Sequence, residues 1–123
     1  MNKYWLVGIG GFLGAIARFW LAGYISNRMG TRFPYGTFVI NITGSFLIGL
    51  LMTMFTERFE FDPIWRLLLV VGFLGGYTTF SSLEWETYTA VRDGGLRIGM
   101  LNVVASVMLG YIAVWLGVML ARR

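Results

Sequence analysis

Long apolar stretches alternate with short polar connections along the chain. The apolar stretches cover residues 4–25, 35–55, 64–91 and 96–121, and each is long enough to cross a bilayer as a helix. The connections at residues 26–34, 56–63 and 92–95 carry charge, glycine or proline, as helix ends usually do. The pattern therefore predicts an all-α membrane protein with four transmembrane helices, forming one domain over residues 1–123.

The composition supports a membrane protein and narrows its chemistry. The 123 residues are 57% apolar and 13% charged, whereas a soluble domain is about 45–50% apolar and about 25% charged. A chain without cysteine or histidine offers no thiol nucleophile or imidazole base, and four spans leave no room for a soluble catalytic domain. The net charge of +4 comes mainly from scattered arginines, which suit anionic lipid better than nucleic acid. An enzyme is therefore not expected.

Basic residues are almost evenly divided between the two ends of the predicted bundle. Four helices place both termini on one side, and Arg18 falls inside the first span. The terminal side then carries Lys3, Arg58, Arg66, Arg122 and Arg123, and the opposite side carries Arg28, Arg32, Arg92 and Arg97. Five against four is too small a bias for the positive-inside rule to fix an orientation. The count predicts dual topology and an antiparallel homodimer, unless the charges nearest the first helix set one orientation.

The second span carries a ridge of small and polar side chains. They recur every four residues, so they share one helix face: Thr37, Asn41, Ser45, Gly49 and Thr53. Such a ridge could line a wet path or let two helices approach closely and hydrogen-bond. Asn41 favours a functional path, because a carboxamide near mid-depth is hard to satisfy and offers two N–H donors to an anion.

The other spans add further polar positions. The fourth span has a small and polar face made of Gly99, Asn102, Ser106, Gly110, Ala113 and Gly117. In the first span, Arg18 could extend to the nearer interface or face a vestibule where it would attract anions. Glu84 and Glu86 are the acids of the third span, and pairing or an interfacial position is favoured over a proton relay.

A helix break is predicted in the third span. Its centre reads G-F-L-G-G-Y-T-T-F-S-S over residues 72–82, a poor helix interior, so the break is expected between Gly75 and Thr79. Broken backbone at membrane depth must be buried in protein or line a cavity. It would expose carbonyls that suit a hard cation and N–H groups that suit an anion. A plain close contact at Gly75 and Gly76 is the alternative.

Three segments together resemble the CrcB/Fluc family of fluoride channels. They are G-G-F-L-G-A-I-A-R at residues 10–18, P-Y-G-T-F-V-I-N-I-T-G-S-F at 34–46 and G-G-Y-T-T-F-S-S at 75–82. The resemblance covers essentially the whole chain. It implies an antiparallel, dual-topology homodimer with two pores that exports fluoride passively from the cytoplasm, across the cell inner (plasma) membrane. It also implies a structural Na⁺ at the dimer centre.

The resemblance also implies roles for particular residues. Backbone carbonyls of Gly75 and Thr78 would hold the Na⁺, and Arg18 would be the arginine of the vestibule. The pore would include Asn41 and Phe80, with polar tracks formed by Thr79, Ser82, Glu86 and Ser106. One position departs from the family pattern T-T-F-S-T-F, because Leu83 stands where a second phenylalanine is expected. Leucine keeps the wall apolar but removes an aromatic edge, a weakly positive ligand for an anion.

Two other functions are alternatives to a fluoride channel. A small four-helix proton-coupled multidrug exporter would need a carboxylate near the middle of the first span, where this chain has Arg18 and no acid. A membrane subunit without transport activity would use the polar ridges for packing alone, and this leaves Asn41 and the glycine-rich break unexplained. The sequence therefore favours a fluoride-selective ion channel.

Overall fold

The computed structural model describes residues 2–58, 60 and 62–123. Within them four helical spans are long and apolar enough to cross a membrane: Lys3–Met29, Tyr35–Arg58, Pro63–Gly94 and Leu96–Arg122. The prediction of an all-helical chain with four such spans is confirmed. The predicted connection at 56–63 contains residues 59 and 61, and the predicted domain includes residue 1; these residues lie outside the described part.

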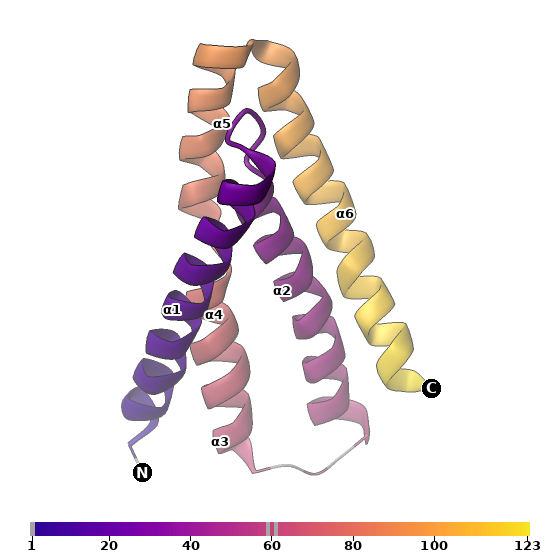
Figure 1. Ribbon diagram of the computed structural model, residues 1–123. Coiled ribbons are helices and arrows are strands. Elements are labelled where there is room, and N and C mark those ends of the chain that lie inside the picture. Colours follow the sequence, from indigo (N-terminus) through magenta and orange to yellow (C-terminus); the bar gives the residue numbers. More distant parts are fainter. Residues whose placement is uncertain (1, 59, 61) are drawn as a thin grey trace.

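The spans form a splayed bundle with both termini at its wider end (Figure 1). Helix α1 (Lys3–Met29) begins after Asn2, whose side chain accepts a hydrogen bond from the Tyr4 N–H at 2.8 Å. It ends at Gly30, whose φ of 80° favours glycine. Helix α2 (Tyr35–Thr53) starts directly after Pro34 and continues as the wider turns of η1 (Met54–Arg58). The second span therefore returns alongside the first.

The third span consists of two helical halves. The first half contains α3 (Pro63–Trp65), η2 (Arg66–Leu74) and α4 (Gly75–Tyr77), and the second half is α5 (Phe80–Gly94). Between them Thr78 and Thr79 are extended, with ψ of 156° and 123°. The break thus follows the paired glycines, which are themselves helical. Gly76 packs closely against the backbone of Gly11 on α1, whereas Gly75 faces open space, so only one glycine serves the close contact.

The fourth span packs through the small face that its sequence predicts. Helix α6 (Leu96–Arg122) follows Gly95, which has φ of 98°, and buries the whole face: Gly99, Asn102, Ser106, Gly110, Ala113 and Gly117. An added Cβ at Gly117 would overlap the Phe46 carbonyl of α2, and one at Gly49 would overlap the Val114 carbonyl of α6. Only glycine permits this backbone approach between α2 and α6.

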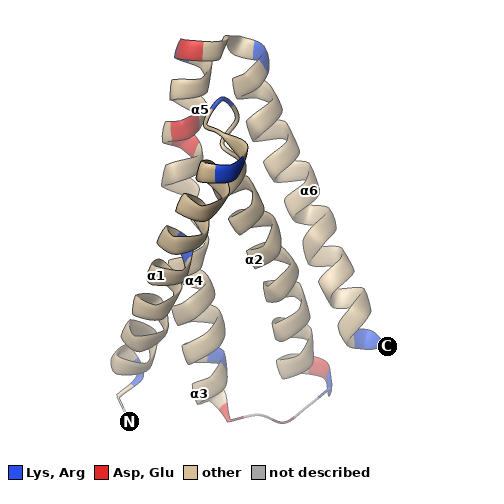
Figure 2. Ribbon diagram, in the orientation of Figure 1, with Lys and Arg blue, Asp and Glu red and all other residues tan. Residues whose placement is uncertain are grey.

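Outward-facing side chains are mostly large and apolar, as a hydrocarbon environment requires. Phe19 is 82% exposed and Tyr111 is 74% exposed. Charged residues gather mainly near the two ends of the bundle (Figure 2). At the wider end, Glu57 accepts two hydrogen bonds from Arg122 at 2.9 and 3.0 Å, which ties η1 to α6. The bundle therefore presents a long apolar band between charged ends, the arrangement that suits a bilayer.

Candidate functional site

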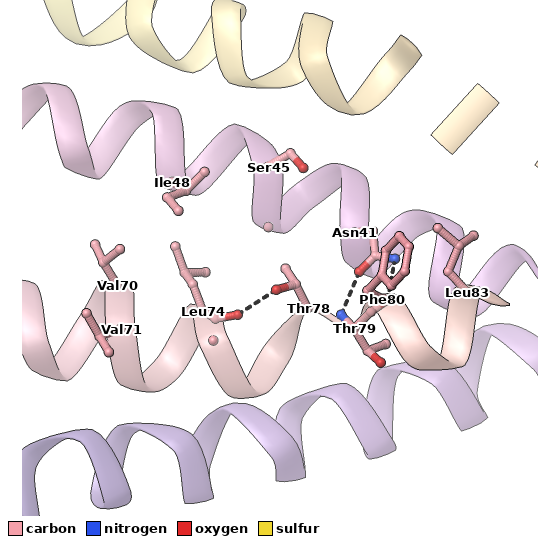
Figure 3. Close-up of a pocket in the computed structure, with 12 residues that line it drawn as sticks. Asn41, Ser45, Ile48, Val70, Val71, Leu74, Thr78, Thr79, Phe80 and Leu83 are labelled. Atoms are coloured by element: carbon pink, nitrogen blue, oxygen red, sulfur yellow. Dashed lines mark hydrogen bonds between the residues drawn. The ribbon is translucent and has the colours of Figure 1, made fainter. Parts of the chain in front are cut away.

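Asn41 holds the break of the third span from the side of α2. Its Nδ2 donates to the Thr79 carbonyl at 3.0 Å, and its Oδ1 accepts from the Thr79 N–H at 2.9 Å (Figure 3). Because Thr79 is extended, its N–H and C=O lack the usual helical partners, and leaving them unpaired in hydrocarbon would cost several kcal/mol each. A carboxamide presents a donor and an acceptor side by side, so one short side chain satisfies both groups.

Two threonines complete the ends of the half-helices at the break. The N–H and Oγ1 of Thr78 both donate to the Leu74 carbonyl, at 3.0 and 2.9 Å. Oγ1 of Thr79 accepts from the Ser82 N–H at 3.2 Å and so caps the start of α5. The Thr-Thr pair therefore ends one half-helix and begins the next, which explains why the chain breaks here and not at Gly75.

Arg18 reaches the same region from α1. It is half-buried, and its Nε donates to the Gly76 carbonyl at 3.1 Å. Gly76 lies in the last turn of the first half-helix, where free carbonyls form the negative end of the helix dipole and favour a cation. The sequence left an interfacial position and a vestibule open for Arg18; in the structure its bonding partner is the broken backbone.

A cavity of about 480 Å³ lies between α2 and the break, and we term it the break cavity (Figure 3). It is lined by Asn41, Gly44, Ser45, Ile48, Val70, Val71, Leu74, Gly75, Thr78, Thr79, Phe80 and Leu83. Phe80 is 75% exposed, whereas Leu83 is 6% exposed and forms part of the inner wall. Polar groups thus enter a largely apolar groove at the level of the break.

A second cavity of about 680 Å³, the loop cavity, lies where the loop after α1 meets α5. It is lined by Ser26, Thr31, Arg32, Phe33, Pro34, Glu86, Thr89, Ala90, Asp93 and Gly94. Glu86, one of the lining residues, accepts a 2.9 Å hydrogen bond at Oε1 from Thr37 Oγ1. Thr37 is buried, so this bond lies inside the bundle.

The Thr37–Glu86 pair lies about one helical turn from residues that line the break cavity. Thr37 precedes Asn41 by four residues on α2, a rise of about 6 Å. On α5, Glu86 follows Leu83 by three residues, a rise of about 4.5 Å. The ridge predicted from the sequence therefore serves two purposes: Thr37 and Asn41 hydrogen-bond to the third span, while Gly49 packs against α6.

A further group of buried polar side chains lies between α5 and α6. Asn102 is fully buried and its Nδ2 donates to Thr87 Oγ1 at 2.9 Å. Thr87 in turn donates to the Leu83 carbonyl at 2.7 Å. The Ser106 hydroxyl and the Asn102 Oδ1 are buried with no hydrogen-bond partner among the described residues. The sequence placed Asn102 on the right face but gave no signal for Thr87, since its role depends on how α5 packs against α6.

Two cavities contain most of the residues predicted as a site, and three residues lie elsewhere. Asn41, Thr79, Phe80 and Leu83 meet at the break cavity together with Gly75 and Thr78. Glu86 lines the loop cavity. Ser82, Ser106 and Arg18 line neither of these cavities: Ser82 lies in the first turn of α5, Ser106 is buried on α6 and Arg18 binds the Gly76 carbonyl.

The carbonyls of Gly75 and Thr78 fit the requirements of a hard cation. A regular helix would pair the Gly75 carbonyl with the Thr79 N–H and the Thr78 carbonyl with the Ser82 N–H. Here the Thr79 N–H donates to Asn41 Oδ1 instead, and the Ser82 N–H donates to the Thr79 hydroxyl. Both carbonyls are therefore left without their helical partners, and both residues line the break cavity. Such oxygens at the end of a half-helix suit Na⁺.

The four spans and the contacts at the break define a small multi-pass membrane protein whose helix break is held by side chains. Residues 5–118 match the model of the family described as CrcB-like protein, Camphor Resistance (CrcB). The chain belongs to the CrcB family.

Similar curated proteins carry the name fluoride-specific ion channel FluC. The protein from Solibacter usitatus is 61% identical over 121 residues, covering 98% of this chain and 99% of the relative. The protein from Acidobacterium capsulatum is 48% identical over 121 residues, covering 98% and 97%. The protein from Methylococcus capsulatus is 45% identical over 117 residues, covering 95% of this chain and 51% of the relative. These relatives are named ion channels, not enzymes.

Proposed function

We propose that this protein is a fluoride-selective ion channel that lets fluoride leave the cytoplasm passively. The observation that carries the proposal is the break held by Asn41, which opens onto a cavity one helical turn from the Thr37–Glu86 pair. The names of the relatives support fluoride as the ion. Because passive export from the cytoplasm requires a channel in the membrane that bounds it, we place the protein in the cell inner (plasma) membrane.

The chemistry of the break cavity suits a small, strongly hydrated anion. A pore must replace the water around fluoride with close hydrogen-bond donors without holding the ion too tightly. Asn41 donates one N–H to Thr79, so its second N–H remains for an ion. The Thr79 hydroxyl accepts from the Ser82 N–H, so its own hydrogen can be donated either to an ion or to the Ser81 hydroxyl 3.5 Å away. The exposed ring of Phe80 adds a weakly positive edge.

The proposed assembly is an antiparallel homodimer with two pores and a structural Na⁺ at its centre. The break cavity contains the 75%-exposed Phe80 and the exposed Gly75, and a second copy would cover both. Gly75 and Thr78 of each copy would contribute carbonyls to the Na⁺, whose charge would hold the breaks together. The relative from Methylococcus capsulatus adds support, because it is about twice as long as this chain and has room for two such units.

Fluoride release from liposomes tests this proposal. Vesicles that contain only the purified protein, loaded with potassium fluoride, should release fluoride when valinomycin balances the charge, and the release should need no pH gradient. Protein-free vesicles are the control. Release that occurs only with a proton gradient, or drug uptake without fluoride release, would favour the exporter. That reading is not favoured, because α1 has no acid among residues 3–29.

Leu83 gives a prediction about the family's second phenylalanine. Leu83→Phe would place an aromatic edge in the wall of the break cavity, which Leu83 lines. We expect the initial rate of fluoride release to rise or stay unchanged, with Leu83→Ile as the control for altered shape. A clear fall with Phe but not with Ile would show that the aromatic edge does not assist the ion here.

A further inference from the structure

The loop cavity has an unusual balance of charge for the mouth of an anion path. Its lining includes two carboxylates, Glu86 and Asp93, and one basic side chain, Arg32. Asp93 is paired with Arg92 at 3.0 Å, and both are exposed. Glu86 lies at the inner end beside Thr37. Arg32 is therefore the one positive charge among the described residues that line this cavity.

Arg32 is available to meet an anion. It is exposed, and within the described residues it makes no hydrogen bond or ion pair. The same holds for the hydroxyls of Ser26 and Thr31, which line the cavity beside it. The third hydroxyl, that of Thr89, is already used, because it donates to the Glu86 carbonyl at 3.0 Å. One guanidinium and two hydroxyls are therefore free donors in a polar cavity.

We propose that the loop cavity is an anion-recruiting site, in which Arg32, Ser26 and Thr31 bind a small anion transiently before it reaches Thr37 and Glu86. This inference rests on the proposed fluoride-channel function and adds residues that determine how fast ions enter. A charge at the mouth of a narrow path raises the local concentration of counter-ions, and salt screens the effect. The negative charge of Asp93 repels an anion and so counteracts the attraction by Arg32. The ion pair of Asp93 with Arg92 partly neutralises that negative charge.

The test compares fluoride release at low and high ionic strength. Arg32→Gln is expected to lower the initial rate about two- to threefold at low salt, the effect of one unit charge about 8 Å from an ion in water. The difference should disappear near 1 M salt, where the screening length falls to about 3 Å. Arg32→Lys keeps the charge and should retain the wild-type rate, which separates recruitment from a loss of structure.

Two more variants complete the test. Asp93→Asn removes an opposing charge and should raise the low-salt rate. Arg97→Gln is the matched control, because Arg97 is an exposed arginine near the same end of the bundle that does not line the cavity. Equal low-salt rates for wild type, Arg32→Gln and Arg97→Gln would overturn the inference while leaving the channel in place. No fluoride release by the wild type would overturn the proposed function itself.

Discussion

Replacing Asn41 by aspartate is expected to lower the initial rate of fluoride release by about 100-fold or more. The aspartate side chain has the same shape but cannot donate to the Thr79 carbonyl when ionised. One of the two hydrogen bonds between residue 41 and Thr79 is therefore lost. It also places a negative charge beside the proposed path of an anion. A 100-fold effect corresponds to about 2.7 kcal/mol in the barrier.

The same change at an exposed site provides the control for Asn41. Asn27→Asp makes an identical chemical change near the end of α1, where the side chain is exposed. Its release rate should remain within about twofold of wild type, as expected for a single screened charge. Size-exclusion elution of the Asn41 variant should match that of wild type if the bundle persists. A well-folded Asn41→Asp protein with the wild-type rate would remove Asn41 from the pore.

Adding one methyl group at Gly14 is expected to destabilise the bundle by about 3 kcal/mol, the upper range for overpacking. Gly14 is buried on α1, and a Cβ there would overlap the Phe73 carbonyl of η2, which cannot rotate away as a side chain can. The free energy of unfolding of Gly14→Ala, measured by denaturant titration in detergent micelles, should therefore fall well below that of wild type.

Gly8 on the same helix is the matched control for Gly14. A Cβ at Gly8 would meet nothing within 4 Å. Because alanine favours a helix over glycine by about 1 kcal/mol, Gly8→Ala should leave stability unchanged or raise it slightly. Similar losses of stability at both positions would mean that the close approach of α1 and η2 does not hold the bundle together.

The helical spans and the buried face of α6 could be predicted because they follow from local properties. The length of an apolar stretch predicts a transmembrane helix. Small residues at three- and four-residue spacing predict the helix face that packs against another helix. The approximate position of the break was also accessible, since a Gly-Gly and Thr-Thr run is a poor helix interior. That the extended residues are Thr78 and Thr79 could not be predicted, because this conformation depends on hydrogen bonds from Asn41 on another helix.

The polar contacts between helices are harder to predict because they depend on which helices pack together. The Thr37–Glu86 bond joins residues 49 positions apart in sequence, and nothing near either residue identifies the partner. Arg18 illustrates the same limit, since the carbonyl it binds belongs to Gly76, 58 positions away. The loop cavity was not predicted either, because Arg32 reads as an ordinary loop arginine until the fold brings it beside α5.

The central claim is that amide and hydroxyl donors and a ring edge near the break replace the hydration shell of fluoride better than that of larger halides. The most direct test is the reversal potential of a planar bilayer that contains only the purified protein, with fluoride on one side and an equal concentration of chloride on the other. The account predicts a large reversal potential of the sign set by fluoride permeation alone. A reversal potential near zero with a measurable current, meaning equal permeability to both halides, would contradict it.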